Sequence, residues 1–121
     1  MRPHALHHVS LNVDDVEAAL RFYSEVLGLV PRPDRPDFPF DGAWLDAGGQ
    51  QLHLIEGQPP PGLGQHFALQ VEDLDATVSE LRGRGVKVSD PRPVGSSRQA
   101  FVTDPSGNLV ELHQTRVPGT T

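Results

Sequence analysis

The sequence His8-Val9-Ser10-Leu11-Asn12-Val13-Asp14-Asp15 recurs 58 residues later as His66-Phe67-Ala68-Leu69-Gln70-Val71-Glu72-Asp73. In both copies apolar positions alternate with others, which is the period of a β-strand with one buried face. The same offset aligns identical residues further along, namely Asp46 with Asp104, Gly49 with Gly107 and Leu54 with Leu112. Two matching patches at one offset indicate a duplicated module.

Each copy of the repeated stretch is followed by a helical pattern. Asp14 and Glu17 have the spacing of a capping box, and a stripe of apolar residues then runs as far as Gly28. A shorter apolar stripe follows the second copy and ends near Gly83 and Gly85. Three short strand candidates follow each helix, at 29–32, 40–46 and 51–56 in the first module and at 86–89, 99–103 and 108–114 in the second.

The order of these elements predicts the fold class. Each module reads βαβββ, so the sequence predicts an α+β protein with two tandem modules, residues 4–57 and 64–115. Residues 58–63 are expected to link the modules and residues 116–121 to form a loose tail, all within a single domain spanning 1–121. Because a helix would cover the apolar face of each sheet, two curved antiparallel-type sheets would enclose a cleft with their other faces.

Four potential metal ligands occupy equivalent places on these other faces. His8 corresponds to His66 and His53 corresponds to Glu111, both at the offset of 58 residues. His53 and Glu111 alternate with the apolar residues of their strands, so they point away from the side expected to face the helix. Three imidazoles and a carboxylate that converge favour a divalent ion, because the ion offsets the cost of bringing these groups together. The donor types suit Zn, Ni, Co, Mn or Fe.

Other side chains on or beside these faces are candidates for contacting a substrate. The candidate cleft residues are Ser10, Asn12, Trp44, Gln51, Gln70, Arg98 and His113. Further aromatic residues could line a cleft or pack in the core, and further arginines could hold a carboxylate or phosphate or be solvated. These residues are Phe38, Phe40, Phe101, Arg32, Arg35 and Arg92.

Composition argues against several classes of function. The formal net charge of −6 and the pI of about 5.4 disfavour binding to nucleic acid or to an anionic membrane surface. The chain has no Cys, so disulfides, thiolate metal sites and cysteine nucleophiles are excluded. No stretch has the pattern of a signal peptide or a membrane span, so we expect a cytoplasmic protein whose partner is a small molecule.

Four segments together resemble the vicinal oxygen chelate superfamily. They are residues 7–15, 51–56, 66–73 and 104–112, and the resemblance extends over about residues 4–115. This superfamily includes glyoxalase I, methylmalonyl-CoA epimerase, extradiol dioxygenases, fosfomycin-modifying thiol transferases and bleomycin-binding proteins. The resemblance implies a glyoxalase-like domain whose metal chelates two neighbouring substrate oxygens and so stabilises an enediolate or a similar oxyanion.

The resemblance also implies roles for individual residues. His8, His66 and Glu111 occupy positions where family members place their metal ligands, and His53 occupies the fourth position. Bacterial glyoxalase I typically carries Glu at that fourth position, and methylmalonyl-CoA epimerase typically carries Gln. Glu111 is therefore the remaining carboxylate of the set. For an isomerisation, either Glu111 leaves the metal transiently and acts as the catalytic base, or a metal-bound hydroxide takes that role.

Several activities are compatible with this resemblance. A metal-dependent lyase or isomerase of the glyoxalase type is the leading expectation. An extradiol-type dioxygenase, a thiol transferase at the same metal, and a non-catalytic protein that binds a drug or metabolite for resistance are the alternatives. Members of the family often form homodimers, some by exchanging modules between chains, so a homodimer is expected.

Overall fold

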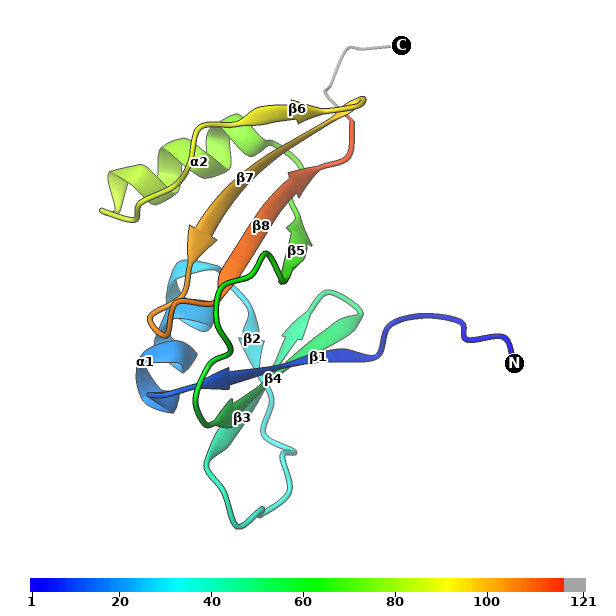
Figure 1. The fold of residues 1–121 in the computed structure, drawn as a ribbon, viewed down its shortest axis with the longest axis vertical. Coiled ribbons are helices and arrows are strands. Elements are labelled where there is room, and N and C mark those ends of the chain that lie inside the picture. Colours follow the sequence, from blue (N-terminus) through cyan, green and yellow to red (C-terminus); the bar gives the residue numbers. More distant parts are fainter. Residues whose placement is uncertain (117–121) are drawn as a thin grey trace. The chain divides into compact units, whose positions relative to one another are not determined.

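A computed structural model describes residues 1–116 of the chain. Internal contacts divide the chain into two units: the first comprises residues 1–61 and 104–108, and the second comprises the rest of the described chain. Each unit holds a four-stranded sheet and a helical segment (Figure 1), which confirms the α+β fold with two βαβββ modules. Of the expected tail, residues 117–121 lie outside the described part.

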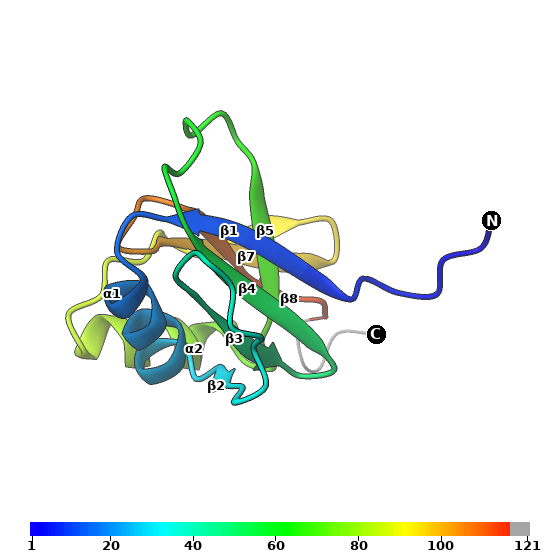
Figure 2. The same cartoon turned by 90° about the horizontal axis from the view of Figure 1, so that it is seen from below.

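The first unit is built on a sheet with the strand order β1-β4-β3-β2. Its elements are β1 (His8–Val13), α1 (Val16–Arg21), the π-helical turn η1 (Phe22–Val26), β2 (Val30–Pro31), β3 (Gly42–Ala47) and β4 (Gln50–Glu56). Helix α1 packs against β3 and β4 (Figure 2). The prolines that follow β2 keep it short and at the sheet edge, as expected for residues without an N–H to donate.

The second unit repeats this plan with the strand order β5-β8-β7-β6. Its elements are β5 (His66–Gln70), α2 (Leu74–Gly83), β6 (Arg92–Val94), β7 (Ser97–Thr103) and β8 (Leu109–Gln114). Helix α2 packs against β7 and β8 (Figure 1).

Both sheets are mixed, a difference from the antiparallel type expected. β1 runs parallel to β4 and β5 runs parallel to β8, whereas the remaining pairs are antiparallel. A parallel pair needs a long crossover between its strands, and the helical segment after the first strand of each module begins such a crossover.

The alternating pattern of the sequence accounts for the core. Apolar strand residues and the apolar stripes of the helices are buried in each unit. In the first unit these are Val13, Val16, Ala19, Tyr23, Leu29, Leu45, Leu52 and Leu54, and in the second Leu74, Val78, Leu81, Ala100, Val102, Val110 and Leu112. Among residues 1–116, no helix has the length and apolar character needed to cross a membrane.

The N-cap of α1 differs from the predicted one. Asp15 caps the helix, and its side chain accepts a hydrogen bond from the Ala18 N–H at 3.0 Å. The prediction that Asp14 is the cap is wrong, because Asp14 accepts a hydrogen bond from the Ser106 hydroxyl at 2.6 Å instead. Asp73, the equivalent of Asp15 in the repeat, caps α2 in the same way.

The strand expected at 86–89 is also wrong, because the edge strand β6 lies at Arg92–Val94. In the expected segment, the Ser89 N–H donates to the Phe101 carbonyl, and the Ser89 hydroxyl accepts from the Phe101 N–H. The side chain thus takes the place of a strand carbonyl, and the following Pro91 has no N–H to extend the ladder.

Residues 104–108 contribute a buried carboxylate to the first unit. Asp104 is 4% exposed and accepts hydrogen bonds from the Tyr23 hydroxyl at 2.8 Å and from the N–H groups of Ser106 and Asn108 at 2.9 Å. Burial, followed by the negative charge of Asp104, raises the pKa of Tyr23 above its usual range. The turn therefore completes the polar interactions of the first module's helix.

Candidate functional site

The first unit brings two of the predicted ligands, His8 and His53, into contact. In the β1–β4 register His8 lies opposite Gln51, so His8 and His53 are diagonal neighbours on one face of the sheet. Their rings are stacked, with centroids 4.0 Å apart and planes 14° apart. From the other neighbouring strand, β3, the Trp44 ring stacks on His53 at 4.2 Å and 8°. His53 therefore lies between two rings and is 8% exposed.

Hydrogen bonding and burial determine the state of His53. Its Nε2 atom lies 2.8 Å from Gln51 Oε1, and an amide oxygen accepts, so Nε2 carries the proton and Nδ1 is the free nitrogen. Burial, and then the positive charge of His8 and His7, lowers the pKa of His53. The ring is therefore favoured in its neutral form, which is the form that binds metals. His7 Nδ1 lies 2.9 Å from His8 Nδ1, so one of these two nitrogens carries the hydrogen and donates it to the other.

The second unit brings the other two predicted ligands together around the carboxylate of Glu111. His66 Nε2 lies 3.0 Å from Glu111 Oε1, and His113 Nδ1 lies 2.8 Å from Oε2. Glu111 is 7% exposed, so its two oxygens depend on these histidines for hydrogen bonds. The ring of Phe101 meets His66 edge-on at 5.4 Å and borders the pair.

A backbone carbonyl fixes the orientation of His66. The Nδ1–H of His66 donates to the Gly64 carbonyl at 2.9 Å, which leaves Nε2 directed at Glu111. This hydrogen bond to Gly64, with the carboxylate of Glu111 adding to it, raises the pKa of His66. Such a backbone contact is also how metal-binding histidines are held in the tautomer that coordinates through Nε2.

The donor chemistry of the two pairs fits a divalent ion, but their geometries differ. His66 Nε2 and Glu111 Oε1 are close enough to bind one ion. The lone pair of an imidazole lies in the ring plane, so the parallel rings of His8 and His53 do not aim at a common point. Accordingly, no group of three or more potential ligands is arranged to hold a metal within residues 1–116.

Three of the candidate cleft residues lie on the predicted faces. Ser10 and Asn12 are exposed and share the face of His8, and Gln70 is exposed at the end of β5. The Asn12 amide donates to the Gln58 carbonyl at 3.1 Å, and the Asn12 carbonyl accepts from Asn108 at 3.0 Å. The Asn12 side-chain amide is thus engaged by the backbone at Gln58, and the Asn12 backbone is bonded to the 104–108 turn.

The structure corrects the prediction for Arg98. This residue shares its face of β7 with the buried residues Ala100 and Val102, which face α2. Its guanidinium donates two hydrogen bonds to the Asp75 carboxylate, at 2.9 and 3.0 Å, in the first turn of α2. Arg98 therefore joins the helix to the sheet on the face opposite Glu111.

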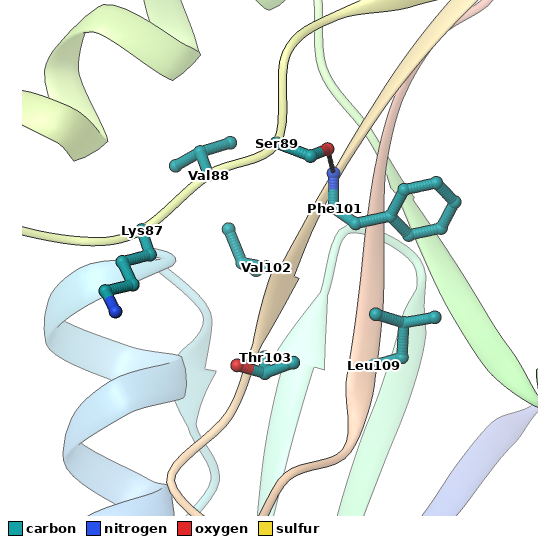
Figure 3. A pocket seen from close by; sticks show the side chains of 7 residues that line it. All are labelled: Lys87, Val88, Ser89, Phe101, Val102, Thr103 and Leu109. Atoms are coloured by element: carbon teal, nitrogen blue, oxygen red, sulfur yellow. Dashed lines mark hydrogen bonds between the residues drawn. The ribbon is translucent and has the colours of Figure 1, made fainter. Parts of the chain in front are cut away.

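A pocket of about 300 Å³ opens beside β7 in the second unit (Figure 3). Its lining residues are Lys87, Val88, Ser89, Phe101, Val102, Thr103 and Leu109. The lining is mostly apolar, and its Ser89 hydroxyl is already engaged by the Phe101 N–H. None of the predicted metal ligands lines it, but Phe101 belongs to both the pocket and the border of the His66–Glu111 pair.

Comparisons with known proteins agree with the sequence pattern. The profile of the "Glyoxalase/Bleomycin resistance protein/Dioxygenase superfamily" matches residues 5–112. The chain is 36% identical to "Probable lactoylglutathione lyase" of Synechocystis sp., over 91% of this chain and 95% of that protein. It is 31% identical to "Lactoylglutathione lyase" of Haemophilus influenzae, over 87% of this chain and 88% of that protein.

A solved structure is similar over nearly the whole chain. The antibiotic binding protein TnmS3 from Streptomyces sp. CB03234 superimposes with a TM-score of 0.80 at 30% sequence identity, covering 94% of this chain and 98% of that one. The duplicated βαβββ fold and these matches lead to one conclusion. The chain belongs to the glyoxalase/bleomycin resistance protein/dioxygenase superfamily.

Proposed function

We propose that the chain is a metal-dependent lyase or isomerase of the glyoxalase type, acting as a homodimer on a small substrate with two adjacent oxygens. His8, His53, His66 and Glu111 are its metal ligands in this proposal, and Glu111 is also the catalytic base. The observation that carries the proposal is the buried Glu111 carboxylate, held between His66 and His113 at 3.0 and 2.8 Å. Relatives named lactoylglutathione lyase support the same class of reaction.

The metal ion, Glu111 and His113 would have distinct roles in the proposed reaction. A bound divalent ion supplies charge stabilisation to substrate oxygens that become negative. Glu111 accepts the proton from the carbon beside those oxygens and returns it, as a carboxylate of low exposure is suited to do. His113 donates to Glu111 Oε2 and so keeps the carboxylate oriented during that exchange.

The stacked rings of His8 and His53 must change their conformation before both can bind one metal ion. His53 has to give up its hydrogen bond to Gln51 or coordinate through Nδ1, and its ring has to turn relative to His8. The proposal requires the His8–His53 pair and the His66–Glu111 pair to meet at one ion, within one chain or across the homodimer.

Cobalt titration of chelator-treated protein tests the proposal, because Co²⁺ bound to imidazole and carboxylate absorbs visible light. We expect about one equivalent of Co²⁺ to bind per chain, and Glu111→Gln to weaken its binding by about tenfold or more. His4→Asn, a change at an exposed terminal histidine, is the matched control and should leave binding unchanged. Wild-type protein that takes up no Co²⁺, Zn²⁺ or Ni²⁺ would overturn the proposal.

Turnover is tested with the reaction named by the relatives. We expect the metal-loaded protein to form or cleave lactoylglutathione, or a related thioester of a hydroxy acid, and Glu111→Gln to abolish this activity.

A non-catalytic binding protein is the second candidate, favoured by the similarity to the antibiotic binding protein TnmS3. In that case Glu111→Gln would leave ligand affinity unchanged, and no turnover would accompany metal binding.

A further inference from the structure

The first unit carries a cavity of about 150 Å³ whose lining includes one arginine, two phenylalanines and a tryptophan. Its lining residues are Arg35, Phe38, Phe40, Trp44, His53, Leu54 and Ile55. From these contacts we propose that the cavity binds an aryl anion, such as an aromatic carboxylate, with its ring among the aromatic side chains and its charge at Arg35. This inference concerns ligand recognition and does not depend on a bound metal.

The aromatic side chains form a continuous array of rings. Phe38 and Phe40 are stacked with centroids 5.0 Å apart and planes 7° apart, and Phe38 lies 6.3 Å from Trp44. Trp44 continues the array by stacking on His53. Such offset and tilted pairs are the arrangements that aromatic quadrupoles favour, so a further flat ring can join them without distorting them.

Two of these rings remain partly open to solvent. Phe38 is 38% exposed and Phe40 is 43% exposed, although both lie in a short loop rather than at a chain end. A pair of exposed phenyl rings costs free energy in water unless something covers it. An apolar cavity of about 150 Å³ is large enough for one benzene molecule, which sets the size of the aryl group.

Arg35 supplies a charge that the protein does not neutralise. Its guanidinium carbon lies 5.0 Å from the centre of the Phe38 ring and 5.5 Å from that of Phe40, within the range of cation–π contact. Its Nη2 donates to the Phe40 carbonyl at 2.9 Å. Within residues 1–116, no carboxylate pairs with Arg35. The remaining N–H groups of the guanidinium are therefore available to a carboxylate.

Two of the other arginines that the sequence offered as anion binders, Arg32 and Arg98, are neutralised by carboxylates. Arg32 is paired at 2.7 Å with both Asp34 and Asp46. Arg98 is paired with Asp75. Of these three arginines, Arg35 lines the cavity and has no carboxylate partner.

A glycine makes room for the Arg35 side chain against the sheet. A Cβ atom at Gly42 would lie 2.9 Å from Arg35 Nη2 and 3.1 Å from Nε, and it would also clash with the Leu54 carbonyl oxygen. The clash with the Leu54 carbonyl is the one that a larger residue could not relieve without moving the backbone. Gly42 therefore leaves space on β3 in which the Arg35 guanidinium lies.

The experiment uses the fluorescence of Trp44, which is the one tryptophan of the chain and lines the cavity. Chelator-treated protein is titrated with benzoate, with neutral benzamide, and with cyclohexanecarboxylate, which has the charge but no aromatic ring. We expect benzoate to bind about tenfold more tightly than either of the other probes. Equal affinity for the three probes, or no change in Trp44 emission, would overturn the inference.

Two variants separate the parts of the site. Arg35→Gln should reduce benzoate affinity to that of benzamide and leave benzamide unchanged, whereas Arg92→Gln, at an exposed arginine of β6, should change neither. Phe38→Leu should weaken benzoate and benzamide alike. If Arg92→Gln weakens benzoate as much as Arg35→Gln does, the attraction is general electrostatics and the inference fails.

The outcome is independent of the proposed metal chemistry. Benzoate binding by a protein that takes up no metal would leave this inference standing and remove the proposed function. Metal uptake and turnover without preference for benzoate would leave the proposed function standing and remove this inference.

Discussion

At the scale of single residues, the buried hydrogen bond between Tyr23 and Asp104 should contribute measurably to stability. Tyr23→Phe removes one of the donors to a carboxylate that is 4% exposed. We expect the free energy of unfolding to fall by about 1–2 kcal/mol at neutral pH. Urea denaturation followed by circular dichroism measures this change.

The same bond predicts a dependence on alkaline pH. Because the pKa of Tyr23 is raised in the folded protein, this residue's contribution to stability is complete below the usual tyrosine pKa of about 10 and is lost as the pH rises above it. Wild-type protein should therefore lose stability more steeply above that pH than Tyr23→Phe does. Parallel curves for the two proteins would contradict this assignment.

His113 is a positioning residue for Glu111, because it donates to Oε2 and has no need to touch the ion. We expect His113→Phe to weaken Co²⁺ binding by about 10–100-fold, the usual cost of removing a partner of a ligand. His113→Gln, which can still donate an N–H, should recover much of that affinity. Visible absorption in a cobalt titration measures both variants, and wild-type affinity in His113→Phe would contradict the role.

At the scale of elements, the two helices begin with equivalent aspartates. Asp73→Ala removes the acceptor for the Ala76 N–H and should cost about 1 kcal/mol in the stability of α2. Glu72→Ala, at the preceding exposed residue, is the matched control and should change stability little. Thermal unfolding of the two variants makes the comparison, and equal losses would show that the cap contributes nothing specific.

The sequence was enough to predict which strand residues share a face, because that depends only on the alternation of neighbours. His53 and Glu111 lie opposite the apolar residues of their strands for this reason. The prediction of a strand at 86–89 was wrong. This segment has the alternation of a strand, but its hydrogen bonds to β7 are made by Ser89 with Phe101. The alternation of apolar and polar residues does not show which neighbouring strand, if any, a segment will pair with by backbone hydrogen bonds.

The stacked rings and the Arg35 cavity could not be predicted in the same way. Stacking of Trp44 on His53 follows from the β3–β4 register, which is set by the turn between the strands. Phe38 and Phe40 lie in a loop, where no helical or strand periodicity predicts the direction of a side chain. For Arg98, the sequence predicted a position just before a strand, whereas the residue lies within β7. Its carboxylate partner, Asp75, lies 23 residues away in the chain.

At the scale of the whole molecule, the proposed ligands lie in two units, and metal binding tests whether they act together. An ion held at about 100 times its Kd stabilises the folded protein by about 2.7 kcal/mol. If one ion takes ligands from both units, Zn²⁺ should slow amide hydrogen exchange in β4 and in β8 with the same concentration dependence. Protection confined to β8 would mean that the His66–Glu111 pair binds alone and that His8 and His53 serve another purpose.

The placement of residues 104–108 has a consequence for whether the first repeat can fold without the second. Their carboxylate completes the interior of the earlier half of the chain, as the hydroxyl of Tyr23 finds its acceptor there. A fragment ending at residue 61 would lose the contact between Tyr23 and Asp104 and should be less stable than the same residues in the whole chain. Adding the missing half as a separate polypeptide should stabilise it. The first repeat is therefore expected to need residues of the later half of the chain for its full stability.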